Sequence, residues 1–152
     1  MSAQRYSFVT PAVALAAATA KTVAAYVSQS GKSSPLAEFN VSFDGVTSSA
    51  APVLVELCTY DVTTPGTRTT GTAGQVGGIR GAIAGTVFHT YTAEPTVLVA
   101  CYQWFVPAYQ GLLHLQMPLG REPEPAASQG FALRCTAPAV VNVRATLVFE
   151  EG

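Results

Sequence analysis

The chain has 152 residues, which is enough for one domain with a substantial core. Hydrophobic residues make up 49% of it and charged residues only 11%, against about 25% in a typical soluble protein, and the net charge is −1. The eight Lys and Arg residues are scattered along the chain, which argues against nucleic acid as a partner, and no run reaches the roughly 18 apolar residues of a membrane-spanning helix.

The N-terminal residues lack a clear strand pattern. Residues 1–10 are predicted to form an arm, in which Tyr6 and Phe8 are apolar anchors that lie on a neighbouring subunit. Residues 11–20 stay open between strand, extended chain and a short helix, because alanine favours helix whereas the threonine and valine that follow favour strand. Residues 21–28 are predicted as a strand.

Two runs in the first half of the chain have the period of a half-buried strand. Residues 38–44 alternate between apolar and polar side chains, and Asp44-Gly45 supplies a turn after them. Residues 52–61 are apolar in places on both faces, which indicates a strand in the middle of a sheet.

A long segment rich in glycine and threonine interrupts this pattern at residues 62–86. It carries Arg68 and Arg80 and no carboxylate. Structureless loops of this length are uncommon in compact domains and are functional or disordered where they occur. The segment is either a mobile surface excursion or a second arm that orders against a neighbouring subunit.

Strand patterns resume after this loop and continue to the end of the chain. Residues 96–106 are the longest apolar run and are predicted as a buried strand. Shorter strands are expected at residues 87–91 and 112–117, and two alternating runs, residues 131–136 and 141–150, close the chain. About eight or nine strands without a clear helix predict an all-β fold, an antiparallel β-sandwich or jelly roll, as a single domain over residues 11–152.

No residue pattern points to catalysis. His89 and His114 both lie in strand-like runs, where a surface or core role is commoner than that of a general base, and no nucleophile elbow, zinc-protease motif or phosphate-binding loop occurs. Glu122 and Glu124 could be an acid pair, but the prolines beside them hold the segment extended and exposed. We therefore expect no enzyme activity, no catalytic residue and no cofactor.

The three cysteines lie far apart in the sequence. They are Cys58, Cys101 and Cys135, and each lies in an apolar strand-like run. No C-x-x-C pair occurs among them, so no metal site is expected. We predict that all three are buried, reduced and structural, which fits synthesis in a reducing cytoplasm.

The shortage of charge predicts association. A surface with so few charges is more readily covered by other protein than left to water, so a homo-oligomer is expected, with a weakly charged monomer as the alternative. The candidate interface residues come from the two unpatterned segments, which we expect to order on neighbouring subunits: Arg5, Tyr6, Phe8, Arg68 and Arg80.

Several short motifs resemble those of the head decoration, or cement, proteins of tailed bacteriophages. They are A-T-A-K-T-V at residues 18–23, V-S-F-D-G-V at 41–46, A-P-V-L-V-E-L at 51–57, A-E-P-T at 93–96, P-L-G-R-E at 118–122 and A-P-A-V-V-N-V-R-A-T-L-V-F-E-E at 137–151. The resemblance implies a jelly-roll-like β-sandwich without enzyme activity that forms oligomers, often trimers. It also implies binding to the major capsid protein on the outer surface of the virion. Residues 1–10 and 62–86 match this pattern least well.

A second class of function stays open. A carbohydrate- or receptor-binding β-sandwich module would use an exposed aromatic side chain, and Tyr102, Trp104 and Tyr109 are the candidates. Packing in the core or in an interface is the simpler explanation for these three rings.

Overall fold

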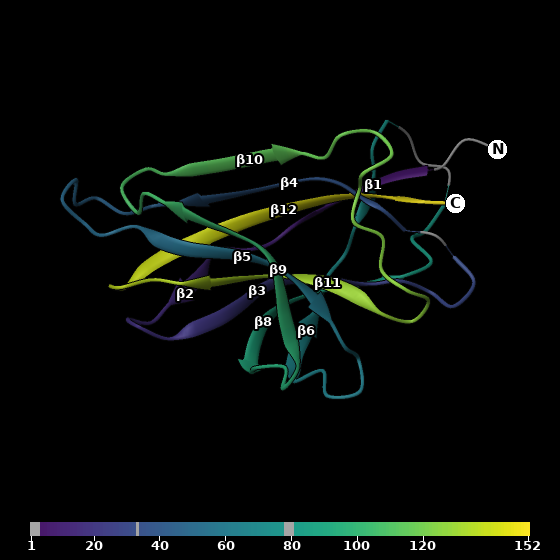
Figure 1. Ribbon diagram of the computed structural model, residues 1–152, viewed down its shortest axis with the longest axis horizontal. Helices are drawn as coiled ribbons and strands as arrows, with labels where there is room; N and C mark the ends of the chain where they lie inside the picture. Colours follow the sequence, from purple (N-terminus) through teal and green to yellow (C-terminus); the bar gives the residue numbers. More distant parts are fainter. Residues whose placement is uncertain (1–3, 33, 78–80) are drawn as a thin grey trace.

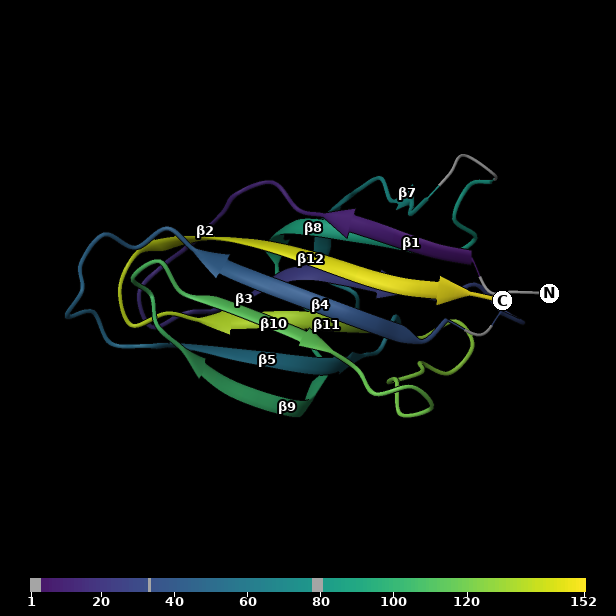
Figure 2. The ribbon, with the colours of Figure 1, turned by 90° about the horizontal axis from the view of Figure 1, so that it is seen from above.

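The computed structural model describes residues 4–32, 34–77 and 81–152. Within these ranges the chain is all-β, with no helix, and its strands form two antiparallel sheets that pack face to face (Figures 1 and 2). The predicted all-β sandwich is confirmed. The strand count of 12 exceeds the expected eight or nine, because short strands also form in segments without a readable alternating pattern.

The first sheet is organised around the last strand of the chain. Its strand order is β10-β4-β12-β1-β7, and β2 pairs with the beginning of β12. The strands are β1 (Gln4–Val9), β2 (Val13–Leu15), β4 (Leu36–Phe43), β7 (Gly74–Gln75), β10 (Leu112–Gln116) and β12 (Val141–Glu151).

The second sheet has the strand order β6-β8-β3-β11-β5-β9. Its central strands β3, β11 and β5 are buried along most of their length, and β9 lies at one end. The strands are β3 (Ala20–Val27), β5 (Val53–Tyr60), β6 (Thr67–Thr70), β8 (Thr86–Ala93), β9 (Leu98–Val106) and β11 (Gly130–Thr136).

The main core lies between the sheets and follows directly from the period-two pattern. Alternate residues of β4 and β12 point inward, and aromatic rings join the layers at the end of the sandwich where the chain begins and ends. There Phe149 stacks on Tyr26 with 4.1 Å between ring centroids and lies 6.1 Å from the ring of Tyr6. All three side chains are buried.

A smaller apolar cluster covers part of the outer face of the second sheet. It contains the rings of Tyr60, Phe88 and Tyr91, which are buried. Arg68 of β6 closes this cluster, because its guanidinium lies 3.5 Å from the ring centroid of Phe88 and 5.4 Å from that of Tyr60. Residues of the second unpatterned segment thus pack on the chain's own sheet.

The expectation of a free N-terminal arm is wrong for the residues that the structure describes. Residues 4–9 form β1, which pairs with β12 from Gln4↔Glu151 to Val9↔Thr146. Tyr6 and Phe8 point into the core and are 2% and 1% exposed. The pattern was too short to identify, since a six-residue strand places only two large apolar side chains on one face.

The segment 11–20 contains strand β2 and no helix. Its alanines do not produce a helix, because pairing of β2 with β12 decides the conformation instead of local propensity.

The glycine- and threonine-rich segment is tied to the sandwich at several points. β6 pairs with β8, and β7 pairs with β1. Close to β8, the backbone N–H groups of Ala84 and Gly85 donate to the carboxylate of Glu151 at 2.7 and 2.8 Å. The expectation of a structureless excursion or an arm is therefore corrected for residues 62–77 and 81–86, and Arg80 lies outside the described residues.

Candidate functional site

Among the described strands, β9 exposes the most large apolar side chains. It pairs with β5 along one edge, and within the described residues no strand pairs with its other edge. Three of its large apolar side chains are well exposed, namely Val99 at 59%, Tyr102 at 48% and Phe105 at 74%. The prediction that residues 96–106 form a buried strand is therefore wrong in burial, although the strand itself is present.

The edge of the sandwich at β9 is only partly closed by the other sheet. β10 ends the first sheet on the same side, and residues 107–111 connect the two strands (Figure 2). Trp104 reaches inward to Phe39, with 5.5 Å between ring centroids, and packs against the core together with Leu113 and Leu115. Trp104 is consequently half-buried, whereas its neighbour Tyr102, stacked on it at 5.9 Å, faces solvent.

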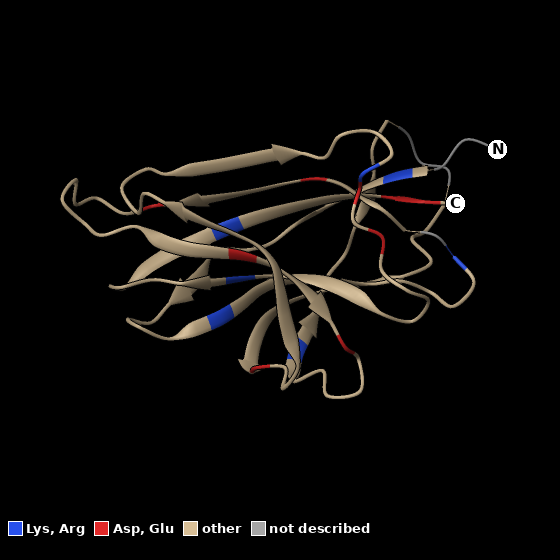
Figure 3. Cartoon of the chain, in the orientation of Figure 1, with Lys and Arg blue, Asp and Glu red and all other residues tan. Residues whose placement is uncertain are grey.

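The segment that forms β9 and β10 carries no formal charge of its own, although Glu124 lies beside Tyr102 and Glu38 lies beside His114. No Asp, Glu, Lys or Arg occurs between residues 95 and 120, a range that includes β9, the connection and β10. In Figure 3 this long stretch is tan throughout, while charges are visible near the two chain ends and on the middle strands. Natural edge strands are usually protected from pairing by charged side chains, proline or a bulge. β9 has no charge and no proline, and its bulge at Cys101 leaves the residues from Tyr102 to Val106 in regular register.

A buried charged cluster lies beside β9 on the outer face of the second sheet. Glu56 of β5 is 4% exposed and accepts hydrogen bonds from Arg134 Nε at 2.7 Å and from Gln103 Nε2 of β9 at 2.6 Å. Burial by itself would raise the pKa of Glu56, but the hydrogen bonds from Arg134 and Gln103 outweigh it and hold the pKa below its usual value of 4.5. The cluster fixes Gln103, and with it the middle of β9, on β5.

Glu56 should make the fold sensitive to acid. Because its pKa is lower in the folded than in the unfolded chain, its contribution to stability is present above pH 4.5 and is lost as the pH falls through the folded-state pKa. We expect Glu56→Gln to lower stability at neutral pH and to flatten the loss of stability in acid. The measurement is the urea midpoint as a function of pH. Some dependence of the urea midpoint on pH should remain in this variant, because the pKa values of Asp44 and Asp61 are also lowered. A pH dependence as steep in Glu56→Gln as in the wild type would contradict the role given to Glu56.

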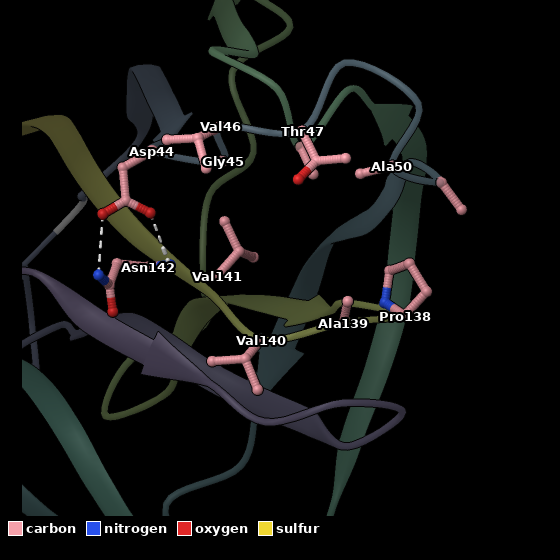
Figure 4. Close-up of a pocket in the computed structure, with 12 residues that line it drawn as sticks. Asp44, Gly45, Val46, Thr47, Ala50, Pro138, Ala139, Val140, Val141 and Asn142 are labelled. Carbon is pink, nitrogen blue, oxygen red and sulfur yellow. Dashed lines mark hydrogen bonds between the residues drawn. The ribbon is translucent and has the colours of Figure 1, made fainter.

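A shallow pocket of about 240 Å³ lies at the end of the sandwich away from the start of β1 (Figures 1 and 4). It is formed by the turn after β4, the connection between β9 and β10, and the turn before β12. Two valines at its rim are strongly exposed, Val46 at 88% and Val140 at 77%. The lining is mostly apolar: Asp44, Gly45, Val46, Thr47, Ala50, Ala51, Ala108, Pro138, Ala139, Val140, Val141 and Asn142.

The acid in this pocket has a structural role. Both carboxylate oxygens of Asp44 accept hydrogen bonds from Asn142, one from its backbone N–H at 2.9 Å and one from its side-chain amide at 2.8 Å (Figure 4). The side-chain hydrogen bond and then the backbone one hold the pKa of Asp44 below its usual value. They join the turn after β4 to the start of β12 and so give the pocket its shape.

The remaining titratable groups do not gather into a reactive site among the described residues. No three His, Cys, Asp or Glu side chains there could hold a metal ion. His89 Nδ1 lies 2.7 Å from the hydroxyl of Thr90, and His114 Nε2 lies 3.7 Å from Glu38 on the first sheet. The same ranges contain no helix long and apolar enough to cross a membrane.

The five predicted interface residues do not form one surface. Arg5 forms an exposed salt bridge with Glu150 at 2.7 Å on the outer face of the first sheet. Tyr6 and Phe8 are buried in the core, Arg68 covers the rings on the outer face of the second sheet, and Arg80 is outside the described residues. Sequence reasoning missed the exposed side chains of β9 and of the pocket rim, although the uncharged run between residues 95 and 120 was visible.

Two of the three cysteines agree with the prediction and one does not. Cys58 and Cys135 are free and buried, and burial raises the pKa of both thiols, that of Cys58 to about 11. Cys101 is free but exposed. The reason is its place in β9. Leu57 of β5 pairs with Tyr102 and Cys58 pairs with Ala100, which leaves Cys101 as the extra residue of a bulge, and no described strand pairs with the outer edge of β9.

Comparison with known proteins found no match to a protein-family model. The search of curated proteins found no match either. The search of solved structures also found no match.

Proposed function

We propose that this chain is a non-enzymatic structural protein of a virion, which binds the outer surface of a bacteriophage capsid and stabilises or decorates it. The observation that carries the proposal is the exposure of large apolar side chains on one edge and one end of a sandwich that has few charges. Such surfaces are typical of contacts with other protein. The phage identity rests on the sequence motifs described above. In this role the chain is made in the host cytoplasm, associates with copies of itself and contacts the major capsid protein.

The pocketed end is the surface that we assign to the capsid. Val46 and Val140 project beside a mostly apolar depression, in which the one charged lining residue, Asp44, is already bonded to Asn142 (Figure 4). A depression of about 240 Å³ between exposed valines suits an apolar side chain of a partner protein better than a small polar ligand, which needs several converging polar groups. The start of β1 and the end of β12, which pair as Gln4↔Glu151, lie at the opposite end of the sandwich, away from this contact (Figure 1).

The test uses particles of the virus whose genome encodes this sequence. Purified particles should contain the chain, and particles stripped of it should bind the purified protein again. The double variant Val46→Lys/Val140→Lys should lose this binding at least tenfold, because each lysine places a charge in a contact that must exclude water. The measurement is co-sedimentation of protein with stripped particles.

A matched control separates the contact from a general effect of added charge. Val9 and Val76 are 60% and 50% exposed, on β1 and just after β7. The double variant Val9→Lys/Val76→Lys adds the same charge and should bind particles normally. Absence of the wild-type chain from purified particles would refute the proposed function, whereas equal binding by both double variants would refute only the assigned end.

One observation favours a second candidate, a carbohydrate- or receptor-binding module. The rings of Tyr102 and Trp104 are stacked with an interplanar angle of 10°, and Tyr102 is 48% exposed. Trp104 is the chain's single tryptophan, so its fluorescence reports directly on a ligand at this position. Saturable quenching by a glycan, abolished in Tyr102→Ala, would favour this candidate over the capsid role.

A further inference from the structure

We infer that two copies of the chain pair through their β9 strands, edge to edge and antiparallel, so that their second sheets join into one continuous sheet. The inference rests on the self-association included in the proposed function and names its surface. It concerns the isolated protein and needs no capsid.

The outer edge of β9 is long and open. β9 spans nine residues, and its outer edge has no partner among the described strands. The strands at the other three ends of the two sheets are shorter: β6 has four residues, β7 has two, and β10 has five. Since an unpaired strand edge presents a row of free backbone donors and acceptors, β9 is the edge with the most to gain from a neighbouring strand.

The lack of charge on β9 favours a second copy of the same strand as its partner. In an antiparallel pair of identical strands, each side chain meets a residue of the same short sequence, so any charge would lie near its own copy and oppose pairing. β9 and the residues that follow it carry no charge as far as residue 120. The edge is thus compatible with itself, and it offers no complementary charge to an acidic or basic partner.

β9 exposes apolar side chains on both of its faces. Tyr102 and Trp104 lie opposite Leu57 and Val55 of β5, which point into the core, whereas Phe105 lies opposite Leu54, on the outer face. A partner that packed on one face would leave the other exposed. A strand added in the plane of the sheet places side chains beside β9 on both faces at once, which covers Tyr102 and Phe105 together.

The irregularity in β9 indicates which part of the strand pairs best. The register with β5 shifts between Leu57 and Cys58, and from Tyr102 to Val106 the pairing is regular. A bulge increases the local twist, so the regular part after it is the better template for a new strand. Such a two-fold contact uses the same surface on both chains and closes at a dimer, whereas a trimer needs a different surface.

The experiment compares two double variants of the isolated chain. The test variant, Val99→Lys/Phe105→Lys, changes two exposed positions on β9 of the second sheet. The control variant, Val9→Lys/Val76→Lys, makes the same chemical change at exposed positions in β1 and just after β7, which belong to the first sheet. Analytical ultracentrifugation at micromolar concentration should give a dimer for the wild type and the control variant. The β9 variant should be a monomer that keeps its β circular dichroism.

Hydrogen exchange supplies an independent readout of strand pairing. Backbone amides of residues 102–106 should exchange at least tenfold more slowly at high than at low protein concentration, and the β9 variant should lose this dependence. A monomeric wild type, a trimer, or a dimer that persists in the β9 variant would overturn the inference. Such a result would leave capsid binding by the Val46 end as a separate question, and loss of capsid binding alone would leave the β9 dimer standing.

Discussion

Replacing Phe149 by alanine should destabilise the protein by roughly 3–5 kcal/mol, the usual range for removing a fully buried phenylalanine. Phe149 is 0% exposed and packs between the two sheets, where its ring stacks on Tyr26 and lies near Tyr6. The loss combines the transfer of the ring to water, the aromatic contacts, and a cavity that the flanking strands cannot close. Urea unfolding followed by circular dichroism measures it.

The matched control is the same substitution at an exposed position. Phe105 is 74% exposed, so Phe105→Ala should change stability by about 0.5 kcal/mol or less when both variants are measured at a concentration where the chain is monomeric. Similar losses for Phe149→Ala and Phe105→Ala would mean that the burial described for one of the two rings is incorrect.

Replacing Glu151 by alanine should cost roughly 3 kcal/mol, because it removes the acceptor of three hydrogen bonds, two of them from the backbone N–H groups of Ala84 and Gly85. Glu151 is 8% exposed, and its carboxylate accepts from the backbone N–H groups of Ala84 and Gly85 and lies 2.8 Å from the hydroxyl of Tyr26. That hydroxyl is itself buried, which raises the pKa of Tyr26 and keeps it protonated. A carboxylate at the end of β12 therefore anchors the chain that enters β8.

The neighbouring glutamate provides the comparison. Glu150 points outward to Arg5 in a half-exposed salt bridge, so Glu150→Ala should cost about 1 kcal/mol or less. Hydrogen exchange should also separate the two variants, since only Glu151→Ala frees the amides of residues 84 and 85. Equal losses of stability in the two variants, with residues 84 and 85 still protected, would argue against the anchor.

Sequence reasoning succeeded where one face of a strand is buried and the strand is long. Alternation in residues 38–44 and 141–150 placed Phe39, Val41, Leu147 and Phe149 in the core, and all four are buried. These strands lie inside the first sheet, where the hydrophobic period records the difference between core and solvent.

The same reasoning failed where an apolar strand is exposed. The run at residues 96–106 is as apolar as a central strand, yet β9 lies at the end of its sheet, and position within a sheet cannot be read from a single strand. The short strands β1, β6 and β7 failed for the opposite reason. Each has too few residues to show a period, and long-range pairing with β12, β8 and β1 decides their conformation.

The candidate site was predicted only in its general character. The low charge indicated contact with other protein, but the exposed residues that would make the contact, such as Val46, Phe105 and Val140, lie on loops and on an edge strand. The predicted interface residues, such as Tyr6 and Arg68, lie instead in two segments without a recognisable strand pattern. They pack on the chain's own strands, because an unpatterned segment can still supply buried side chains.

β12 pairs with β4 on one side and with β1 on the other. The first sheet therefore has no central strand until the ribosome has translated residues 141–151. Strands β1 and β4 have no shared partner until residues 141–151 are added, so the inward side chains of both stay exposed on the nascent chain. Assembly of this sheet therefore waits for residues 141–151 and depends on closing loops that span most of the 152 residues, which slows folding. A translation product that stops before residue 141 retains the strands of the second sheet but has no strand to join β1 to β4, and it should be a substrate for chaperones and proteases.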